Sequence, residues 1–326
     1  MRQVILEAPG KFAEREAIAP VAQNGHALVR MERVGVCGSD FHAFAGDHPV
    51  YTYPRVLGHE LAGMVVEAPA NSRGIAPGSR CAIEPYLTCG SCRACAQGRR
   101  NACERLRLLG IHVDGGMQEF LSVPLELVHP SAQLSLDQLA LVETLGIGAH
   151  AVDRSGLHAG ESVLIVGAGP IGISVAQFAC AAGASVHIVE KSEWRRALVG
   201  RMGYASSLTA EDRGADVVFD ATGSAAAMAA SLAYVATGGR LVFVGLTRDR
   251  VAIDDALFHR KELSILASRN SFGLFPRIIR LMEEGRINTS HWVTDRLHLS
   301  EVVSQFGSLP TRTTLMKAIV EVNESA

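Results

Sequence analysis

The sequence contains no segment typical of a targeting signal, a membrane span or a nucleic-acid-binding patch. The first residues, MRQVILEAPGKF, lack a basic stretch followed by an apolar core, so a secretory signal is not expected. No apolar run approaches the ~18 residues that a membrane-spanning helix needs. The net charge is −2 and like charges do not gather in blocks, which disfavours binding to nucleic acid or a membrane surface. These absences predict a soluble, cytoplasmic protein.

Cysteine is scarce outside one short stretch. The 326-residue chain has seven cysteines, an odd number, and four of them fall within residues 89–103. This distribution does not suit a secreted disulfide scaffold, whereas clustered cysteines in a chain without a signal peptide are more often metal ligands. We interpret the isolated Cys81 and Cys180 as buried structural thiols. The length predicts about two domains.

The cysteine cluster has the spacing C-x2-C-x2-C-x7-C, through Cys89, Cys92, Cys95 and Cys103. Four thiolates in one loop are typical of a closed tetrahedral zinc site that stabilises a lobe with little core of its own. Disulfides are a poor alternative, because cysteines three residues apart rarely reach bridging geometry. An iron–sulfur cluster is the main chemical alternative, since four-cysteine sites serve both metals.

A second set of residues predicts a catalytic metal site. Cys37 follows a predicted strand, and His59 and Glu60 lie beside the next one. Three protein ligands and an open fourth position define a catalytic zinc site. Glu143 falls in a predicted helix, residues 139–150, where a carboxylate on an apolar face is costly unless it is paired or bound to metal. Each of these residues alone has an ordinary structural interpretation, but together they favour a ligand set.

Residues 162–172, SVLIVGAGPIG, open a region in which strands and helices alternate. Its glycine turn, with a strand before it, a helix after it and an acid at the end of the next strand, indicates a dinucleotide-binding fingerprint. The turn residues predicted to contact the cofactor are Gly167, Gly169, Pro170, Ile171 and Gly172. Glu190 is expected to accept the ribose hydroxyls and to favour NAD, because a carboxylate repels the 2′-phosphate of NADP. The nearby Lys191 and Arg195 weaken that preference.

Three later strands of this region are predicted at residues 216–220, 240–244 and 263–267. Their ends are expected to line the cofactor with Thr222, Gly223, Val244, Gly245, Leu246, Ser268 and Arg269. A helix is predicted at 274–284, and a final strand at 315–322 is expected to return to the first domain.

Six motifs resemble those of the zinc-containing medium-chain dehydrogenase/reductase family. They are VGVCGSD (34–40), PRVLGHELAG (54–63), the cysteine loop, GGMQEFLSVP (115–124), VGAGPIG (166–172) and DATG (220–223). The resemblance implies an α/β protein with a GroES-like, mostly-β catalytic domain and a Rossmann domain with a doubly wound parallel sheet. The catalytic domain would comprise residues 1–146 and 280–326, and the Rossmann domain residues 147–279.

The resemblance also implies two zinc ions per chain. Cys37 and His59 would bind the catalytic ion, Glu60 would be a ligand or its near neighbour, and Glu143 would be the further carboxylate of the polyol-dehydrogenase branch. The cysteine loop would bind the structural ion. One departure is Thr144, because the family usually has proline after that glutamate. Another is the short stretch between Glu190 and the next strand, which predicts a reduced helix there.

The implied reaction is NAD-linked oxidation of a secondary alcohol held by zinc. Ser39 matches the hydroxyl that receives the alcohol proton, and His42 is placed to relay it outward. YPRVLGHE (53–60), LGIHVDGG (109–116) and FHRKELSILASRNS (258–271) are further similar to sugar-acid and polyol enzymes, especially the L-galactonate dehydrogenase type. Arg269 is the candidate for binding a substrate carboxylate. A role in contacting the cofactor or a subunit interface is an equal alternative for this arginine.

Other interpretations stay open at this point. A sorbitol-like polyol, threonine or a simple alcohol would fit the same family, and a cofactor-binding protein with a degenerate site is the non-enzyme alternative. The resemblance implies a homodimer or homotetramer, formed through strands after Gly245, and a small-molecule alcohol as the substrate.

Overall fold

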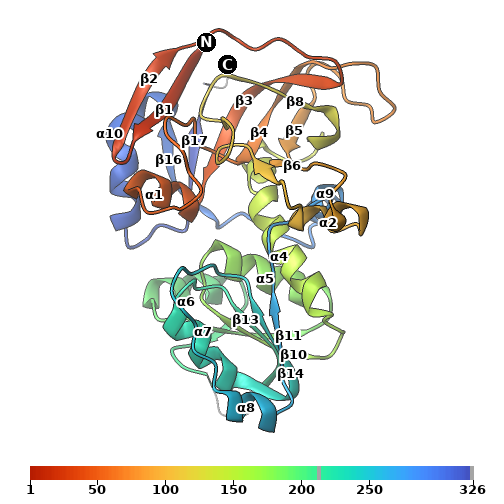
Figure 1. Cartoon of the computed structure of the whole chain (residues 1–326), viewed down its shortest axis with the longest axis vertical. Coiled ribbons are helices and arrows are strands. Elements are labelled where there is room, and N and C mark those ends of the chain that lie inside the picture. The colour runs from red at the N-terminus through yellow and green to blue at the C-terminus, as the bar shows by residue number, and fades with distance from the viewer. Residues whose placement is uncertain (211–213, 324–326) are drawn as a thin grey trace. The chain divides into compact units, whose positions relative to one another are not determined.

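The computed structural model describes residues 1–210 and 214–323, which form two compact units (Figure 1). Unit 1 contains Met1–Glu143, Phe275–Glu283 and the segment from Trp292 onward; unit 2 contains Thr144–Leu274 and Glu284–His291. The predicted domain bounds, residues 1–146 with 280–326 and residues 147–279, stay a prediction.

Unit 1 is built on a seven-stranded mixed sheet in the order β16-β17-β3-β4-β5-β9, with β8 paired to β3. The C-terminal strand β17 pairs antiparallel with β3, so the two ends of the chain share one sheet. Two small two-stranded sheets, β1-β2 and β6-β7, accompany it. The strands are β1 Arg2–Ala8, β2 Lys11–Glu16, β3 His26–Val36, β4 Glu60–Glu67, β5 Arg80–Ile83, β6 Tyr86–Leu87, β7 Arg107–Leu108, β8 Phe120–Pro124, β9 Val128–Pro130, β16 Val293–His298 and β17 Lys317–Glu321.

The helices of unit 1 are short and join the strands. They are α1 Gly38–Ala45, α2 Arg93–Ala96, α3 Leu136–Ala140, α9 Phe275–Glu283 and α10 Val302–Gln305. Helix α3 begins with a capping box, in which Ser135 Oγ accepts from Gln138 N and Gln138 Oε1 accepts from Ser135 N. The helix predicted at 139–150 is therefore wrong in its bounds, because Ser135 begins a separate helix and α4, Val142–Ser155, runs beyond it.

Unit 2 is a six-stranded sheet in the order β12-β11-β10-β13-β14-β15, with every pair parallel. This order is that of a doubly wound dinucleotide-binding sheet, and helices flank the sheet (Figure 1). The strands are β10 Ser162–Val166, β11 Ser185–Val189, β12 Ala205–Ser207, β13 Ala215–Asp220, β14 Val235–Phe243 and β15 Ser264–Ala267. The helices are α5 Pro170–Ala181, α6 Glu193–Arg201, α7 Ala225–Ser231 and α8 Asp255–Arg260.

The core of unit 2 explains why its strands were recognisable from the sequence. Ile165, Val217, Phe219 and Val242 are buried along neighbouring strands, as β-branched and apolar runs in a parallel sheet predict. The predicted strands 162–166 and 185–189 match the observed bounds. In unit 1, the strand predicted at 117–123 begins later, at Phe120.

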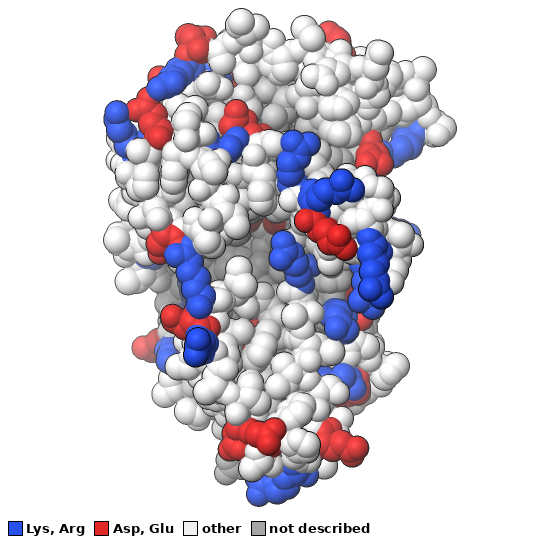
Figure 2. Space-filling model, in the orientation of Figure 1, with Lys and Arg blue, Asp and Glu red and all other residues white. Residues whose placement is uncertain are grey.

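Within the described residues, no helix is long and apolar enough to cross a membrane. On the face drawn in Figure 2, acidic and basic side chains both occur across the surface. This mixture agrees with the small net charge of −2.

Candidate metal centres and cofactor turn

The antiparallel pairing of β3 with β4 brings the first candidate ligands together. Gly35 of β3 lies opposite Glu60 of β4, so Cys37, just past the end of β3, comes close to His59 and Glu60. Ligand atoms of these three residues all lie within 4.8 Å of one another. Sulfur, imidazole and carboxylate form a donor set that suits zinc. His59 Nδ1 is buried without a hydrogen-bond partner among the described residues, so the histidine is not simply a satisfied core residue.

Asp40 lies against two of these residues, Cys37 and His59, and was not predicted from the sequence. Its Oδ2 accepts a hydrogen bond of 2.9 Å from Cys37 N, and its Oδ1 lies 3.8 Å from His59 Nδ1. Burial lowers the pKa of His59, but the negative charges of Asp40 and Cys37 outweigh it and raise the pKa well above its ordinary value. A carboxylate behind a ligand histidine orients the ring toward a metal. The available signal was an acid at the third position of the helix that follows Cys37.

Glu60 forms a buried ion pair that the sequence did not reveal. Lys317 Nζ donates to both carboxylate oxygens at 2.6 and 2.8 Å, and the two side chains are only 3% and 1% exposed. Burial lowers the pKa of Lys317, yet the charge of Glu60 more than compensates and the pKa is raised. Lys317 begins β17, whose pairing with β3 brings it beside the candidate metal ligands. In this structure Glu60 is therefore both a possible ligand and the partner of a cation.

Glu143 lies outside the group formed by Cys37, His59 and Glu60. It is buried in the first turn of α4, where its Oε1 accepts a 2.5 Å hydrogen bond from the Tyr86 hydroxyl. Burial raises the pKa of Glu143, and the nearby charge of Glu60 adds to the effect. Its predicted role as a zinc ligand, direct or through water, stays a prediction.

Ser39 and His42, the residues predicted to move the proton, both lie on α1. Ser39 Oγ is buried and has no hydrogen-bond partner among the described residues. His42 is exposed, and its Nδ1 lies 2.9 Å from Asp47 Oδ1 at the surface. The structure therefore places Ser39 two residues from the candidate ligand Cys37, and His42 on the exposed side of the helix.

Gly35 provides the space that Glu60 occupies. A Cβ atom added at Gly35 would lie 2.0 Å from Glu60 Oε2. We expect Gly35→Ala to displace the carboxylate from Lys317 and to destabilise unit 1 by ~1–3 kcal/mol, the usual cost of overpacking. Thermal unfolding together with zinc analysis measures both effects. Gly38→Ala is the matched control, because a Cβ there meets nothing within 4 Å; equal behaviour of the two variants would contradict this explanation.

The four cysteines of the loop meet in one cluster. The ligand atoms of Cys89, Cys92, Cys95 and Cys103 all lie within 4.8 Å of one another. Cys103 Sγ lies 3.4 Å from Cys89 Sγ and 3.9 Å from Cys92 Sγ, and a tetrahedral zinc–thiolate site requires about 3.8 Å between sulfurs. Backbone N–H groups of Ser91 and Cys92 lower the pKa of Cys89 to about 5, which favours the thiolate that binds metal. The cluster is compatible with a structural zinc ion.

The two remaining cysteines differ from each other. Cys81 is fully buried in β5, as predicted, but the side chain of Cys180 is exposed on α5. The prediction of a buried thiol was wrong for Cys180, because it lies near the C-terminal end of α5, past the residues that pack on the sheet.

The glycine turn of unit 2 has the expected close packing. Gly167 has a φ of +101°, and a Cβ at Gly172 would lie 1.9 Å from Gly167 O. Gly169 precedes the first residue of α5, Pro170, which needs no hydrogen-bond acceptor for its nitrogen. The N–H groups of the first turn of α5, including that of Ile171, have no acceptor within the helix and are suited to a phosphate group.

Glu190 lies at the end of β11, beside this turn. Its Oε2 accepts a 2.7 Å hydrogen bond from Ala168 N and its Oε1 accepts one of 2.8 Å from Ser192 N. Each carboxylate oxygen has a second lone pair, so ribose hydroxyls can still be accepted. Lys191 is exposed, whereas Arg195 is half-buried, 3.9 Å from the position of a Cβ on Gly169. A cation therefore lies close to the glycine turn, opposite in charge to Glu190.

The loops after β13, β14 and β15 contain the other predicted cofactor residues. Thr222 Oγ1 donates to Asp220 Oδ1 at 2.8 Å, and a Cβ at Gly245 would lie 2.3 Å from Gly223 N, so the first two loops pack tightly. Val244 N donates to Asp220 O and Ser268 N to Phe243 O, at 2.9 Å each. Leu246 and Arg269 are exposed. These residues lie at the carboxyl ends of parallel strands, the edge at which such sheets bind ligands.

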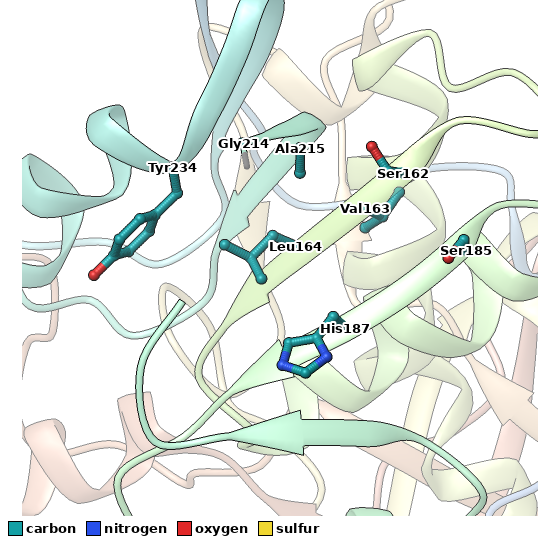
Figure 3. A pocket seen from close by; sticks show the side chains of 8 residues that line it. All are labelled: Ser162, Val163, Leu164, Ser185, His187, Gly214, Ala215 and Tyr234. Atoms are coloured by element: carbon teal, nitrogen blue, oxygen red, sulfur yellow. The ribbon is translucent and has the colours of Figure 1, made fainter. Parts of the chain in front are cut away.

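Figure 3 shows a pocket of about 200 Å³ elsewhere in unit 2. Its labelled residues lie mostly on β10 and β11, with His187 and Ser185 at one side and Tyr234 at the other. None of the predicted cofactor residues lines it.

No helix occurs among the described residues between β12 and β13. This agrees with the reduced helix predicted from the short stretch between Glu190 and the next strand.

Comparison with known proteins identifies the family. Residues 23–133 match the family described as alcohol dehydrogenase GroES-like domain, and residues 170–284 match zinc-binding dehydrogenase. The L-galactonate-5-dehydrogenase of Escherichia coli K12 is 37% identical over 310 residues, which are 91% of each chain. The chain belongs to the zinc-containing medium-chain dehydrogenase/reductase family.

Two other members of the family extend this comparison. The 2-dehydro-3-deoxy-L-galactonate 5-dehydrogenase of Pseudoalteromonas atlantica is 32% identical and covers 95% of both chains. The crystal structure of a zinc-binding dehydrogenase from Sinorhizobium meliloti, bound to NADP, has a TM-score of 0.92 with 32% identity over 98% of this chain and 99% of that one. The predicted fold class, a GroES-like unit with a Rossmann unit, is confirmed. The protein is a zinc-type alcohol oxidoreductase of the group that includes sugar-acid and polyol dehydrogenases.

Proposed function

We propose that the protein oxidises a secondary alcohol of a sugar acid or polyol, such as L-galactonate, to the ketone, with NAD as the hydride acceptor. The observation that carries the proposal is the group of Cys37, His59 and Glu60 within 4.8 Å of one another in unit 1. It is supported by the two 5-dehydrogenases that are 37% and 32% identical to the chain. The proposal assigns the alcohol to unit 1 and the cofactor to unit 2.

In the proposed mechanism, Cys37, His59 and a carboxylate would hold a zinc ion. The bound ion would supply Lewis-acid chemistry that lowers the pKa of the substrate hydroxyl. Ser39 Oγ, buried and without a partner among the described residues, is positioned to accept the proton. His42, already paired with Asp47 at the surface, would pass it to solvent. The carboxylate of Asp40 lies 3.8 Å from His59 Nδ1, where its charge acts on the imidazole, and Lys317 balances the charge of Glu60.

The cofactor would lie on the glycine turn of unit 2. There the N-terminus of α5 would hold the pyrophosphate, and bound NAD would supply the nicotinamide as a hydride acceptor. Thr222, Val244 and Ser268, at the ends of neighbouring strands, are proposed to contact the rest of the cofactor. Ser268 Oγ is buried without a hydrogen-bond partner among the described residues, which supports this assignment.

Glu190 should determine the choice between NAD and NADP. We expect Glu190→Gln to raise the ratio of kcat/KM for NADP to that for NAD by about 10- to 100-fold, because a hydrogen bond to a charged group is lost and the repulsion of the 2′-phosphate is removed. The amide oxygen can still accept the hydrogen bond from Ala168 N. Glu193→Ala, which removes an exposed carboxylate three residues away, is the control. An unchanged ratio in Glu190→Gln would contradict the assignment of the ribose to Glu190.

The substrate class is tested with a panel of aldonates and polyols. NADH formation is measured with L-galactonate, sorbitol, threonine and 2-propanol, and we expect the highest kcat/KM for the sugar acid. Arg269→Met should lower kcat/KM for the aldonate more than for sorbitol if the guanidinium binds the carboxylate. A preference for threonine or 2-propanol would overturn the proposed substrate but not the family's chemistry. A homodimer or homotetramer remains the proposed assembly.

A further inference from the structure

Tyr51 is a buried phenol beside the candidate metal ligands, and the mechanism above does not use it. Tyr51 is 7% exposed, and its hydroxyl meets the geometry of a hydrogen bond with no described residue. Leaving such a group unsatisfied costs about 1–3 kcal/mol, so its retention requires an explanation. Ser39 Oγ, also buried, is in the same state.

The Tyr51 hydroxyl lies near Asp40, Cys37 and Ser39, because all three affect its pKa. Burial is the main cause that raises the pKa of Tyr51, and the negative charges of Asp40 and Cys37 raise it further. An interaction with the Ser39 side chain, which does not meet the geometry of a hydrogen bond, lowers it. The phenol is therefore close to the ligand Cys37 and to the hydroxyl assigned to the substrate proton. A phenol with an ordinary pKa of about 10 is already protonated at neutral pH, and it acts there as a hydrogen-bond donor.

The ring of Tyr51 is held in place by His48. The two rings pack edge to face, with centroids 4.8 Å apart and an interplanar angle of 85°. Tyr53, two residues along, has a different role, because its hydroxyl donates to Ala43 O at 2.6 Å. The two tyrosines of this loop therefore differ. Tyr53 is hydrogen-bonded to α1, whereas the Tyr51 hydroxyl has no such bond and lies near Ser39.

We propose that Tyr51 is a specificity-determining residue that donates a hydrogen bond to a second substrate oxygen, on the carbon next to the one that is oxidised. The inference rests on the proposed function and names a chemical feature of the substrate: a vicinal hydroxyl or an equivalent oxygen. A site built around a buried donor rejects an analogue that lacks the matching oxygen, because the donor is then left unpaired.

The test compares 2,3-butanediol with 2-butanol, secondary alcohols that differ by one neighbouring hydroxyl. We expect the wild-type protein to prefer the diol, and Tyr51→Phe to reduce the ratio of the two kcat/KM values by about tenfold or more, mainly through the diol. The melting temperature of the free protein should stay the same or rise, because an unsatisfied hydroxyl is removed. Tyr53→Phe should lower the melting temperature and leave the substrate ratio unchanged.

The possible outcomes separate the inference from the function on which it rests. An active Tyr51→Phe variant with the wild-type ratio overturns the inference alone, and so does a fall in melting temperature as large as that of Tyr53→Phe. A wild-type protein that reduces neither NAD nor NADP with any alcohol, including L-galactonate, overturns the proposed function and the inference together.

Discussion

Cys37→Ser should lower kcat/KM for alcohol oxidation by about 10³-fold or more and reduce the zinc content from two ions per chain to one. The Lewis acid contributes several kcal/mol to the reaction, and each 1.4 kcal/mol corresponds to a factor of ten in rate. The thiolate of Cys37 belongs to a compact ligand group, in which all ligand atoms lie within 4.8 Å of one another. A hydroxyl is a much weaker zinc ligand at neutral pH than a thiolate.

The cofactor site provides an internal check on this variant. Gly167 and Glu190 lie in unit 2 and do not depend on Cys37, so the dissociation constant for NAD, measured by fluorescence titration, should change little. Cys180→Ser is the matched control, because Cys180 is exposed and belongs to neither cysteine group. Wild-type turnover in Cys37→Ser would refute the assignment of the metal site.

Lys317→Met should destabilise unit 1 by about 3–5 kcal/mol, the usual cost of leaving one member of a buried ion pair alone. Lys317 donates to both oxygens of Glu60, and both side chains are almost fully buried. Methionine keeps most of the side-chain volume, so the loss arises from the uncompensated carboxylate. The remaining charge would also be free to move toward the metal, and zinc binding should change at the same time.

The stability change can be measured in unit 1 alone. Trp292 is fully buried in unit 1, and the other tryptophan, Trp194, lies in unit 2. In a Trp194→Phe background, tryptophan fluorescence during urea unfolding reports on unit 1. The double variant Lys317→Met/Glu60→Gln should recover a large part of the lost stability, because no buried charge is left unpaired. Equal destabilisation of the single and double variants would show that the pair does not act as proposed.

The sequence predicted most where local spacing determines the geometry. Three features depend on residues within about twenty positions of each other: the cysteine loop, the glycine turn and the strands on either side of that turn. The structure contains all three as their patterns predicted. The grouping of Cys37, His59 and Glu60 depends on one contact between distant segments, the pairing of β3 with β4. The motifs VGVCGSD (34–40) and PRVLGHELAG (54–63), which lie next to these two strands, made the grouping predictable.

The features that the sequence did not reveal depend on contacts between distant segments. Lys317 meets Glu60 across 257 positions, and Tyr86 meets Glu143 across 57. A lysine or a tyrosine in a strand has no spacing that indicates a buried partner so far along the chain. Nothing in the sequence distinguishes Tyr51 from other aromatic residues of loops, because the burial of its hydroxyl near Ser39 and Cys37 depends on the fold.

The central claim, zinc-dependent hydride transfer from a secondary alcohol, is tested most directly with L-galactonate that carries deuterium at carbon 5. After reaction with NAD, mass spectrometry of the cofactor should show one deuterium in NADH, and removal of the labile zinc should abolish its formation. Undeuterated NADH, or equal transfer by the zinc-depleted protein, would contradict the account.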